Sequence, residues 1–400
     1  MSAQSPGPLS GVRVIDLCHL LAGPYATYTM ARLGADVVKV EDPVRPDEAR
    51  SIGPFFPDGL SLYFASLNTG KRSLAVSFGT PEGRKVLARL IRRSDVVVDN
   101  FRPGVLHRLG LHHEELDRLN PRIISCSITG YGETGPYAEY PGYDYTIQAM
   151  AGVMSITGEP DGPPGKAGIS YVDHSGGLAA ALGVCAALFR RERTGRGEHI
   201  DLGLFDAQIS MLTYLASWQL NAGLETRRFA DGAHPSLVPA QTFETADGYL
   251  SVFVGNDGMW RRLVAALDED YLAIEEFATN AARQERRTEV VARLQHLFRG
   301  GGLDHWLTVL RAANVACAPV NSLKAALNDD QVVTRGLVTT VPGGRDGDGY
   351  SVLSTPLPTM ESPGVARRAP LLGESTDEVL GELGYTNTQI DLLRGRSVVT

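Results

Sequence analysis

The first 130 residues alternate between short β-branched runs and helix-like stretches, and this alternation most constrains the fold. The apolar runs lie at residues 12–17, 36–41, 95–99 and 122–129, and helical patterns lie at 25–33 and 80–92. Apolar strands that alternate with helices predict a parallel sheet with helices on both faces. We therefore expect an α/β fold, with a Rossmann-like, doubly wound large domain over residues 1–220.

The carboxyl ends of these strands are the expected place for a ligand, because doubly wound sheets bind ligands beyond that edge. Those ends carry His19, Glu41 and the runs 100–102 and 130–132. Aromatic, amide and guanidinium side chains therefore meet at one edge of the predicted sheet.

Residues 130–135, GYGETG, fit the pattern G-x-G-x-x-G of dinucleotide sites. That pattern also requires a helix directly afterward, whose N-terminus faces the pyrophosphate. Pro136 and Pro141 interrupt the residues that follow, so a long helix cannot begin there. The sequence thus argues against an NAD or FAD site.

Asp173 lies where the apolar run 168–172 gives way to a predicted helix at 175–193. An Asp at such a junction commonly caps the helix by accepting backbone N–H bonds. The same position also suits a nucleophilic carboxylate beside N–H donors that stabilise an oxyanion. The residues alone leave both readings open.

The pattern of predicted secondary structure changes near residue 225. A loop rich in Gly and Pro at 230–239 precedes a strand pattern at 248–254 and several amphipathic helices. We expect a smaller α+β domain at 225–327 and a C-terminal segment, 331–400, that returns to the large domain.

Composition excludes several classes of protein. The net charge of −8 offers no basic excess for nucleic acid. The four cysteines are isolated, which predicts reduced thiols and neither a disulfide framework nor a metal site. The start of the chain is polar, and no apolar run approaches 18 residues, so we expect a cytoplasmic protein without a membrane partner.

Several stretches in chain order resemble the family III CoA-transferases of the CaiB/BaiF type. They include GVRVIDLCHLLAGPYAT, LGADVVKVEDP, DVVVDNFRPGVLHRLGL, YVDHSG and RTGRGEHIDLGLFDA. The family includes formyl-CoA and succinyl-CoA-dependent dicarboxylate transferases, and the α-methylacyl-CoA racemases share its fold. The resemblance implies an interlocked, ring-like homodimer whose substrates are an acyl-CoA and a carboxylic acid, with no further cofactor.

The resemblance also implies residue roles. Asp173 in YVDHSG matches the nucleophilic aspartate. Contacts to CoA are expected at Leu21, Ala22, Val76, Asn100, Phe101, Arg102, Arg108, Tyr143 and Asp144. Substrate contacts are expected at His19, Tyr143 and His234.

The arginines fit their expected role, because guanidinium groups bind phosphates with charge-assisted, often bidentate bonds. The alternative for Arg102 and Arg108 is an exposed helical face. The alternative for His234 is a loop histidine bonded to its neighbours.

The expected reaction moves CoA through an aspartyl mixed anhydride and an aspartyl-CoA thioester. Backbone N–H groups of residues 175–177 and 130–135 are candidate oxyanion donors. Succinyl-CoA as donor and a dicarboxylic acid as acceptor are favoured.

Two alternatives remain open on the sequence. One is a racemase-like isomerase, but the racemases carry a histidine where Tyr143 stands, and a tyrosine with a pKa near 10 is a poor base. The other is a catalytically silent acyl-CoA-binding paralogue.

Overall fold

The computed structural model describes residues 7–342, 349–357, 360 and 367–400. The chain forms two compact units. Unit 1 comprises residues 1–151, 169–212 and 329–400, and unit 2 comprises 152–168 and 213–328. Residues 152–168 and 213–220, which we expected in the large domain, thus belong to unit 2.

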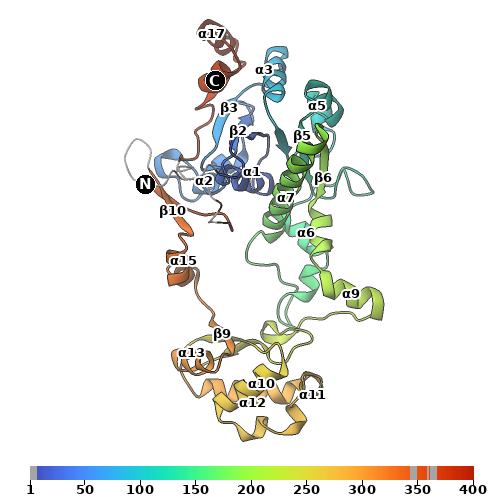
Figure 1. Ribbon diagram of the computed structural model, residues 1–400, viewed down its shortest axis with the longest axis vertical. Helices are drawn as coiled ribbons and strands as arrows, with labels where there is room; N and C mark the ends of the chain where they lie inside the picture. The colour runs from blue at the N-terminus through green and yellow to red at the C-terminus, as the bar shows by residue number, and fades with distance from the viewer. Residues whose placement is uncertain (1–6, 343–348, 358–359, 361–366) are drawn as a thin grey trace. The chain divides into compact units, whose positions relative to one another are not determined.

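Unit 1 contains a six-stranded parallel sheet (Figure 1). Its strands are β1 (Arg13–Asp16), β2 (Asp36–Glu41), β3 (Arg72–Ala75), β4 (Val96–Asp99), β5 (Ile124–Thr129) and β6 (His199–Gly203). They lie in the order β3-β2-β1-β4-β5-β6, with every neighbouring pair parallel. This is the strand order of the Rossmann fold. The prediction of an α/β chain with a parallel sheet is confirmed.

The two faces of this sheet bury different side chains. Val14, Val96 and Val98 pack in one hydrophobic cluster with α1 (Ala22–Arg32) and α7 (Tyr171–Thr194). Ile15 and Val97 point into a second cluster on the opposite face. The helices of that cluster are α3 (Pro81–Arg92), α5 (His113–Leu119), α16 (Thr376–Glu382) and α17 (Asn387–Gly395). Alternating side chains with both faces covered explain why successive residues of β1 and β4 are apolar.

Helix α7 begins earlier than the sequence predicts and packs closely on α1. A Cβ atom added at Gly177 would lie 2.6 Å from the carbonyl oxygen of Ala22. One added at Gly176 would lie 2.3 Å from a methyl carbon of Leu204. The small residues at the start of α7 are therefore required by the approach of its neighbours.

By length and composition, α7 could cross a membrane. Our expectation that no apolar run approaches that length is wrong for this helix, because its neutral residues between Tyr171 and Phe189 are nearly all apolar or small. Within unit 1 the helix packs against α1, β5, β6 and α8 (Leu204–Ser210), as a core helix does.

Strand β3 has no counterpart among our predicted strands. Its first two residues are polar, yet both are buried. Arg72 pairs with Asp36 at 2.6 Å and with Glu382 at 2.7 Å, and Ser73 donates to Glu41 at 3.3 Å. Ion pairs thus allow burial of a strand that hydrophobic periodicity does not reveal.

Unit 2 contains a three-stranded antiparallel sheet packed on helices. The strands are β7 (Ala240–Glu244), β8 (Tyr249–Phe253) and β9 (Ala316–Pro319), in that order. Their buried residues share one hydrophobic core with α10 (Asp257–Leu267), α12 (Arg287–Arg299) and α13 (Leu303–Ala312).

The other α-helices and one hairpin of the described residues divide between the two units. In unit 1 they are α2 (Leu62–Asn68), α4 (Val105–Leu109), α6 (Asp144–Met150), α15 (Asp330–Thr334) and the hairpin β10 (Val338–Val341) and β11 (Tyr350–Leu353). In unit 2 they are α9 (Thr213–Ala222), α11 (Asn280–Glu285) and α14 (Leu323–Leu327).

Two fully buried lysines hold the sheet and the first helices of unit 1 together. Lys71 Nζ donates at 2.8 Å to each of Asp16 Oδ2, Thr27 Oγ1 and Asn68 Oδ1. Burial by itself would raise the pKa of Asp16, but the charges of Lys71 and Lys39 outweigh burial and hold that pKa well below its usual range. The carboxylate of Asp16 is therefore ionised in the core.

The second lysine, Lys39, lies beneath the loop that follows β1. Its Nζ forms an ion pair with Asp47 Oδ2 at 2.9 Å and donates to the carbonyl oxygen of Cys18 at 2.7 Å. The other carboxylate oxygen of Asp47 accepts the backbone N–H groups of Leu20 and Ala49, each at 3.0 Å. Both lysines thus fix the backbone at the carboxyl edge of the sheet.

Replacing Lys71 with Met tests this network. The change leaves the buried carboxylate of Asp16 without its cation, so we expect unfolding in urea to require about 3–5 kcal/mol less free energy. The control is Lys85→Met on the exposed surface of α3, for which we expect a change within about 0.5 kcal/mol. Equal stability of the two variants would contradict the assigned role of Lys71.

Candidate active site

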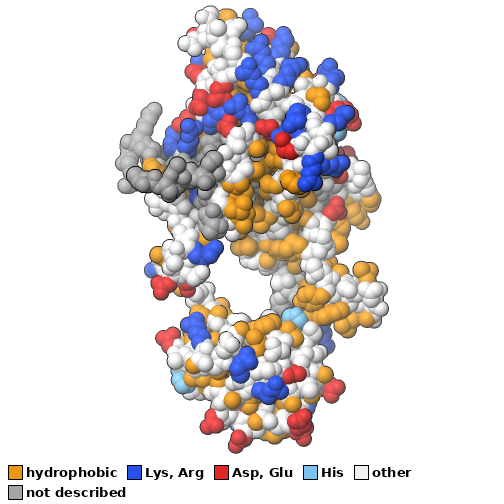
Figure 2. Space-filling view, viewed as in Figure 1, with side chains coloured by type: hydrophobic (Ala, Val, Ile, Leu, Met, Phe, Trp, Pro, Cys, Tyr) orange, Lys and Arg blue, Asp and Glu red, His pale blue; other side chains and the backbone are white. Residues whose placement is uncertain are grey.

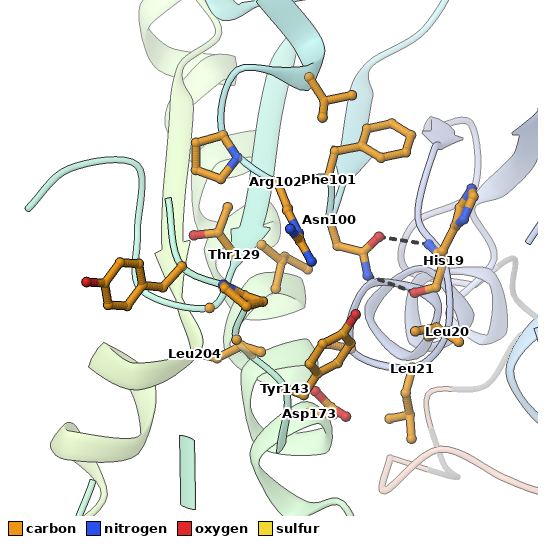
Figure 3. A pocket seen from close by; sticks show the side chains of 18 of the residues that line it. His19, Leu20, Leu21, Asn100, Phe101, Arg102, Thr129, Tyr143, Asp173 and Leu204 are labelled. Atoms are coloured by element: carbon orange, nitrogen blue, oxygen red, sulfur yellow. Dashed lines mark hydrogen bonds between the residues drawn. The ribbon is translucent and has the colours of Figure 1, made fainter. Parts of the chain in front are cut away.

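A cavity of about 570 Å³ opens at the carboxyl edge of the unit 1 sheet (Figure 3). The loop after β1, the residues after β4, the end of β5, the start of α6 and the first turn of α7 form its walls. Eight of the expected site residues line it: His19, Leu21, Ala22, Asn100, Phe101, Arg102, Tyr143 and Asp173. Segments far apart in sequence therefore meet where the topology predicts a ligand.

Asn100 fixes the loop after β1. Its Oδ1 accepts the backbone N–H of His19 at 2.8 Å, and its Nδ2 donates to the His19 carbonyl oxygen at 2.7 Å (Figure 3). The next residue, Leu20, has a φ of 64°, a conformation that costs a non-glycine residue about 1 kcal/mol or more. The hydrogen bonds from Asn100 and Asp47 hold this conformation in the cavity wall.

His19 presents a neutral imidazole. Burial lowers the pKa of His19 below its ordinary value, despite the nearby carboxylate of Asp47. Its ring meets the ring of Phe101 edge-on, with centroids 5.6 Å apart. At pH 7 this side chain can therefore donate or accept a hydrogen bond without adding charge to the cavity.

Two glycines position Tyr143. A Cβ added at Gly130 would lie 2.6 Å from the Cα of Gly142, so the loop after β5 and the residue before Tyr143 cross in direct backbone contact. The backbone N–H of Tyr143 then donates to Thr146 Oγ1 at 3.0 Å, which starts α6. The Tyr143 side chain is 56% exposed and lines the cavity.

Asp144, and not Asp173, caps α7. The helix begins at Tyr171, and Asp144 Oδ1 accepts the backbone N–H of Val172 at 3.0 Å. Our expectation that Asp173 stands at the junction before the helix is therefore wrong, because α7 begins two residues before it, at Tyr171. Asp173 is the third residue of α7, where the helix dipole favours a negative charge.

The first turn of α7 also corrects one expectation about oxyanion donors. Because the helix begins at Tyr171, the N–H groups of residues 175–177 lie beyond its first turn and bond within the helix. In the loop after β5, the N–H of Gly132 donates to Thr129 Oγ1 at 2.9 Å, and that of Glu133 donates to Asp201 Oδ2 at 3.0 Å. These donors are occupied by the protein itself.

Three residues near the cavity were not predicted from the sequence. Burial and then the charge of Asp173 raise the pKa of Tyr63 in α2 to about 12, so its hydroxyl stays protonated. Arg45 and Glu48 line the cavity from the segment after β2. No local sequence motif marks these residues, because only the tertiary fold brings them close to the site.

Three expected CoA contacts do not line this cavity. Val76 is fully buried and pairs with Val399 at the sheet edge. Arg108 is exposed on α4. Asp144 is 4% exposed and lies beneath the site, where its two oxygens accept bonds from Val172 and from Gln148.

His234 belongs to unit 2. Its Nδ1 accepts the backbone N–H of Ser236 at 3.1 Å, and its Nε2 lies 3.2 Å from the hydroxyl of Tyr214. Burial and the charge of Arg287 lower the pKa of His234. Within unit 2 this histidine is bonded to its neighbours, which is the geometry of the alternative reading.

A carboxylate in the first turn of a helix, lining a cavity at the carboxyl edge of a doubly wound sheet, lies where proteins of this fold bind their ligands. Comparison with known proteins identifies the class. Residues 9–376 match the family model described as CoA-transferase family III. The chain belongs to this family, and it is a CoA-transferase.

Several relatives can be aligned with this chain over nearly its full length. A succinate–glutarate CoA-transferase of Agrobacterium fabrum is 41% identical, with 94% of this chain and 96% of that protein covered. The succinyl-CoA:glutarate CoA-transferase of Mus musculus is 38% identical, with 98% and 90% covered. The crystal structure of a CAIB/BAIF family protein from Brucella suis is 38% identical, with a TM-score of 0.83 over 95% of this chain and 100% of that one.

Asp99, at the end of β4, gives a test by pH. Burial raises its pKa to about 7, although Ser127 and the backbone N–H of Phe101 donate to it. Because the folded pKa lies above the unfolded value of 3.8, the fold favours the protonated acid, and stability falls as pH rises from about 4 to about 7.

The measurement compares the free energy of unfolding of the natural chain and of Asp99→Asn at pH 5 and pH 8. The difference between the two chains should shift by on the order of 2 kcal/mol in favour of the variant at pH 8. A difference that is independent of pH would show that Asp99 does not titrate in this range.

Proposed function

We propose that Asp173 is the nucleophile that carries acyl groups and CoA between two acids. The ionised carboxylate attacks the acyl carbon of the donor thioester. The carbon–sulfur bond breaks, CoA departs as the thiolate, and Asp173 and the acyl group are joined in a mixed anhydride. The thiolate then attacks the aspartyl carbonyl carbon, which forms an aspartyl-CoA thioester and frees the donor acid. The acceptor carboxylate reverses the two steps.

One observation supports this role more than any other. Asp173 lies in the first turn of α7, where the helix dipole favours the ionised carboxylate that the attack requires. Its carboxylate lines the cavity beside the expected CoA-contacting segment of Asn100, Phe101 and Arg102.

The neighbouring side chains fit transfer better than proton exchange at carbon. Tyr143 supplies a hydroxyl in the cavity wall, and His19 supplies an imidazole that burial keeps neutral. Hydroxyl and N–H donors stabilise the oxygen that becomes negative when a thioester is attacked. Because one thioester is exchanged for another of similar energy, the route as written uses no group besides the thioester and the acid.

We propose succinyl-CoA as donor and a dicarboxylic acid as acceptor. Support comes from the relatives that act on succinate and glutarate by their names, and from the cation Arg45 in the cavity wall. Arg102 and Arg108 are proposed to contact the CoA phosphates. The four cysteines form no disulfide among the described residues, which fits our placement of the reaction in the cytoplasm.

We also propose that two copies form the interlocked, ring-like homodimer that the family resemblance implies. In unit 1, Leu182 and Phe189 on α7 are 71% and 62% exposed, and Figure 2 shows hydrophobic side chains gathered over that region. In unit 2, no described residue of α9 is buried. Exposed apolar surfaces of this kind mark contacts with another chain.

Replacing Asp173 with Ala tests the nucleophile. We expect the rate of CoA exchange between succinyl-CoA and glutarate to fall by about 1000-fold or more, because the variant lacks the carboxylate proposed to form the anhydride. CoA binding by calorimetry should persist. The control is Asp391→Ala on the exposed surface of α17, which should retain full exchange. Turnover in Asp173→Ala would overturn the assignment.

The assembly is tested by light scattering. We expect a native mass of twice 43.0 kDa that persists on dilution, because interlocked chains separate only by unfolding. Leu182→Glu should reduce the fraction of this species, since a charge would enter the apolar contact. Asp391→Lys serves as a control. A native mass of one chain would contradict the proposed dimer.

A further inference from the structure

Unit 1 holds a second cavity, of about 420 Å³, beside the one described above. It is bounded by the segment Phe101–Pro103, which both cavities share, and by the helices α4 and α5. Its floor is the face of β5 and β6, which presents Ser125 and His199. The proposed transfer uses neither of these side chains.

A chain of hydrogen-bonding side chains crosses this floor. Ser125 Oγ lies 2.8 Å from His199 Nδ1, and His199 Nε2 lies 3.1 Å from Glu133 Oε2. His113 Nδ1 approaches the same serine oxygen at 3.3 Å. Four residues from three segments thus form one continuous network in the cavity wall.

One arrangement of protons satisfies every group in this network. Glu133 is acceptor-only when ionised, so His199 carries its proton on Nε2 and offers a free lone pair on Nδ1 to the Ser125 hydroxyl. The proton on His113 Nδ1 then points at Ser125 Oγ. In this assignment the serine proton faces a base, and an N–H donor faces the serine oxygen.

The position of Glu133 is itself fixed. Its backbone N–H donates to both oxygens of Asp201, at 3.1 and 3.0 Å, which holds the loop after β5 against β6. The His199 and His113 rings are stacked, with centroids 5.0 Å apart, which limits rotation of the base. A nucleophile within hydrogen-bond reach of a base, and a base oriented by a third group, is the arrangement of an activated serine.

We propose that Ser125, His199 and Glu133 form a second, hydrolytic site that cleaves short, uncharged acyl esters. Ser125 is 3% exposed, so the ester must be small enough to enter the cavity. Glu114, Glu133 and Glu139 line the cavity and repel acyl groups that carry a carboxylate. The substrates of this site are thus distinct from the dicarboxylic acids proposed for Asp173.

The chemistry balances with water as the second reactant. Ser125 Oγ attacks the ester carbonyl carbon while its proton passes to His199 Nδ1, and His113 Nδ1–H donates to the developing oxyanion. The bond from the carbonyl carbon to the alcohol oxygen breaks, and the alcohol leaves with the proton from His199. Water, deprotonated by His199, then attacks the acyl-serine carbonyl carbon. The bond from that carbon to Ser125 Oγ breaks, His199 returns the proton to Oγ, and the acid leaves.

Hydrolysis of p-nitrophenyl butyrate by the full-length Asp173→Ala variant tests the proposal without the transferase nucleophile. We expect hydrolysis to persist, and a further Ser125→Ala change to lower kcat/KM by about 100-fold or more. His199→Gln should have a similar effect. The matched control is Ser94→Ala, another buried serine, whose hydroxyl donates to the Leu90 carbonyl oxygen and which does not line the cavity. This change should leave the hydrolysis rate as it is in Asp173→Ala alone.

A fluorophosphonate probe provides the second readout. After digestion, mass spectrometry should find the phosphonyl group on Ser125, and CoA transfer by Ser125→Ala with Asp173 intact should show that this variant folds. Should Ser125→Ala fail to fold, Glu133→Gln at a half-exposed position should slow labelling by about 10-fold or more. Absence of the adduct, an adduct elsewhere, or hydrolysis unchanged by Ser125→Ala would overturn the proposal.

Discussion

The candidate active site depends on two lysines buried in the core of unit 1. Lys71 and Lys39 neutralise Asp16 and Asp47 in the core; Lys39 also donates to the Cys18 carbonyl in the loop after β1, and Lys71 donates to the Pro24 carbonyl in α1. Ions taken out of water cost several kcal/mol each unless they are paired and fully bonded. The bonds made here meet that requirement, and Asp47 in turn holds Leu20 in its left-handed conformation. Buried ion pairs therefore hold the loop after β1 in the wall of the candidate cavity.

Two neighbouring carboxylates have different positions: Asp144 binds the start of α7, and Asp173, the proposed nucleophile, lines the cavity. Asp144 is buried and accepts the Val172 N–H, so α7 has its cap from a neighbouring helix. Asp173, one residue further along α7, is half-buried and faces the cavity. Gly176 and Gly177 then let α7 approach its neighbours, which sets the depth at which Asp173 lies. The neutral His19 lines the same cavity, together with the cations Arg45 and Arg102.

The sequence predicts elements that depend on neighbouring residues in the chain. The strand at residues 36–41 is found with the same bounds, because its apolar run is bounded by polar residues. Strand β3 escapes prediction, since Arg72 is buried through ion pairs to residues more than 300 positions away. The cap on α7 escapes for the same reason, because Asp144 lies 28 residues from Val172. Tyr63, and the pair of Ser125 and His199, likewise meet their neighbours only through the tertiary fold.

Covalent capture tests the central assignment most directly. The enzyme is loaded with succinyl-CoA and treated with hydroxylamine, which converts an acylated aspartyl group to a hydroxamate, and its peptides are then analysed by mass spectrometry. If Asp173 is the nucleophile, a hydroxamate forms on Asp173 and only when thioester is present. A hydroxamate on Asp144 or another carboxylate, with Asp173 unmodified while exchange proceeds, would contradict this assignment.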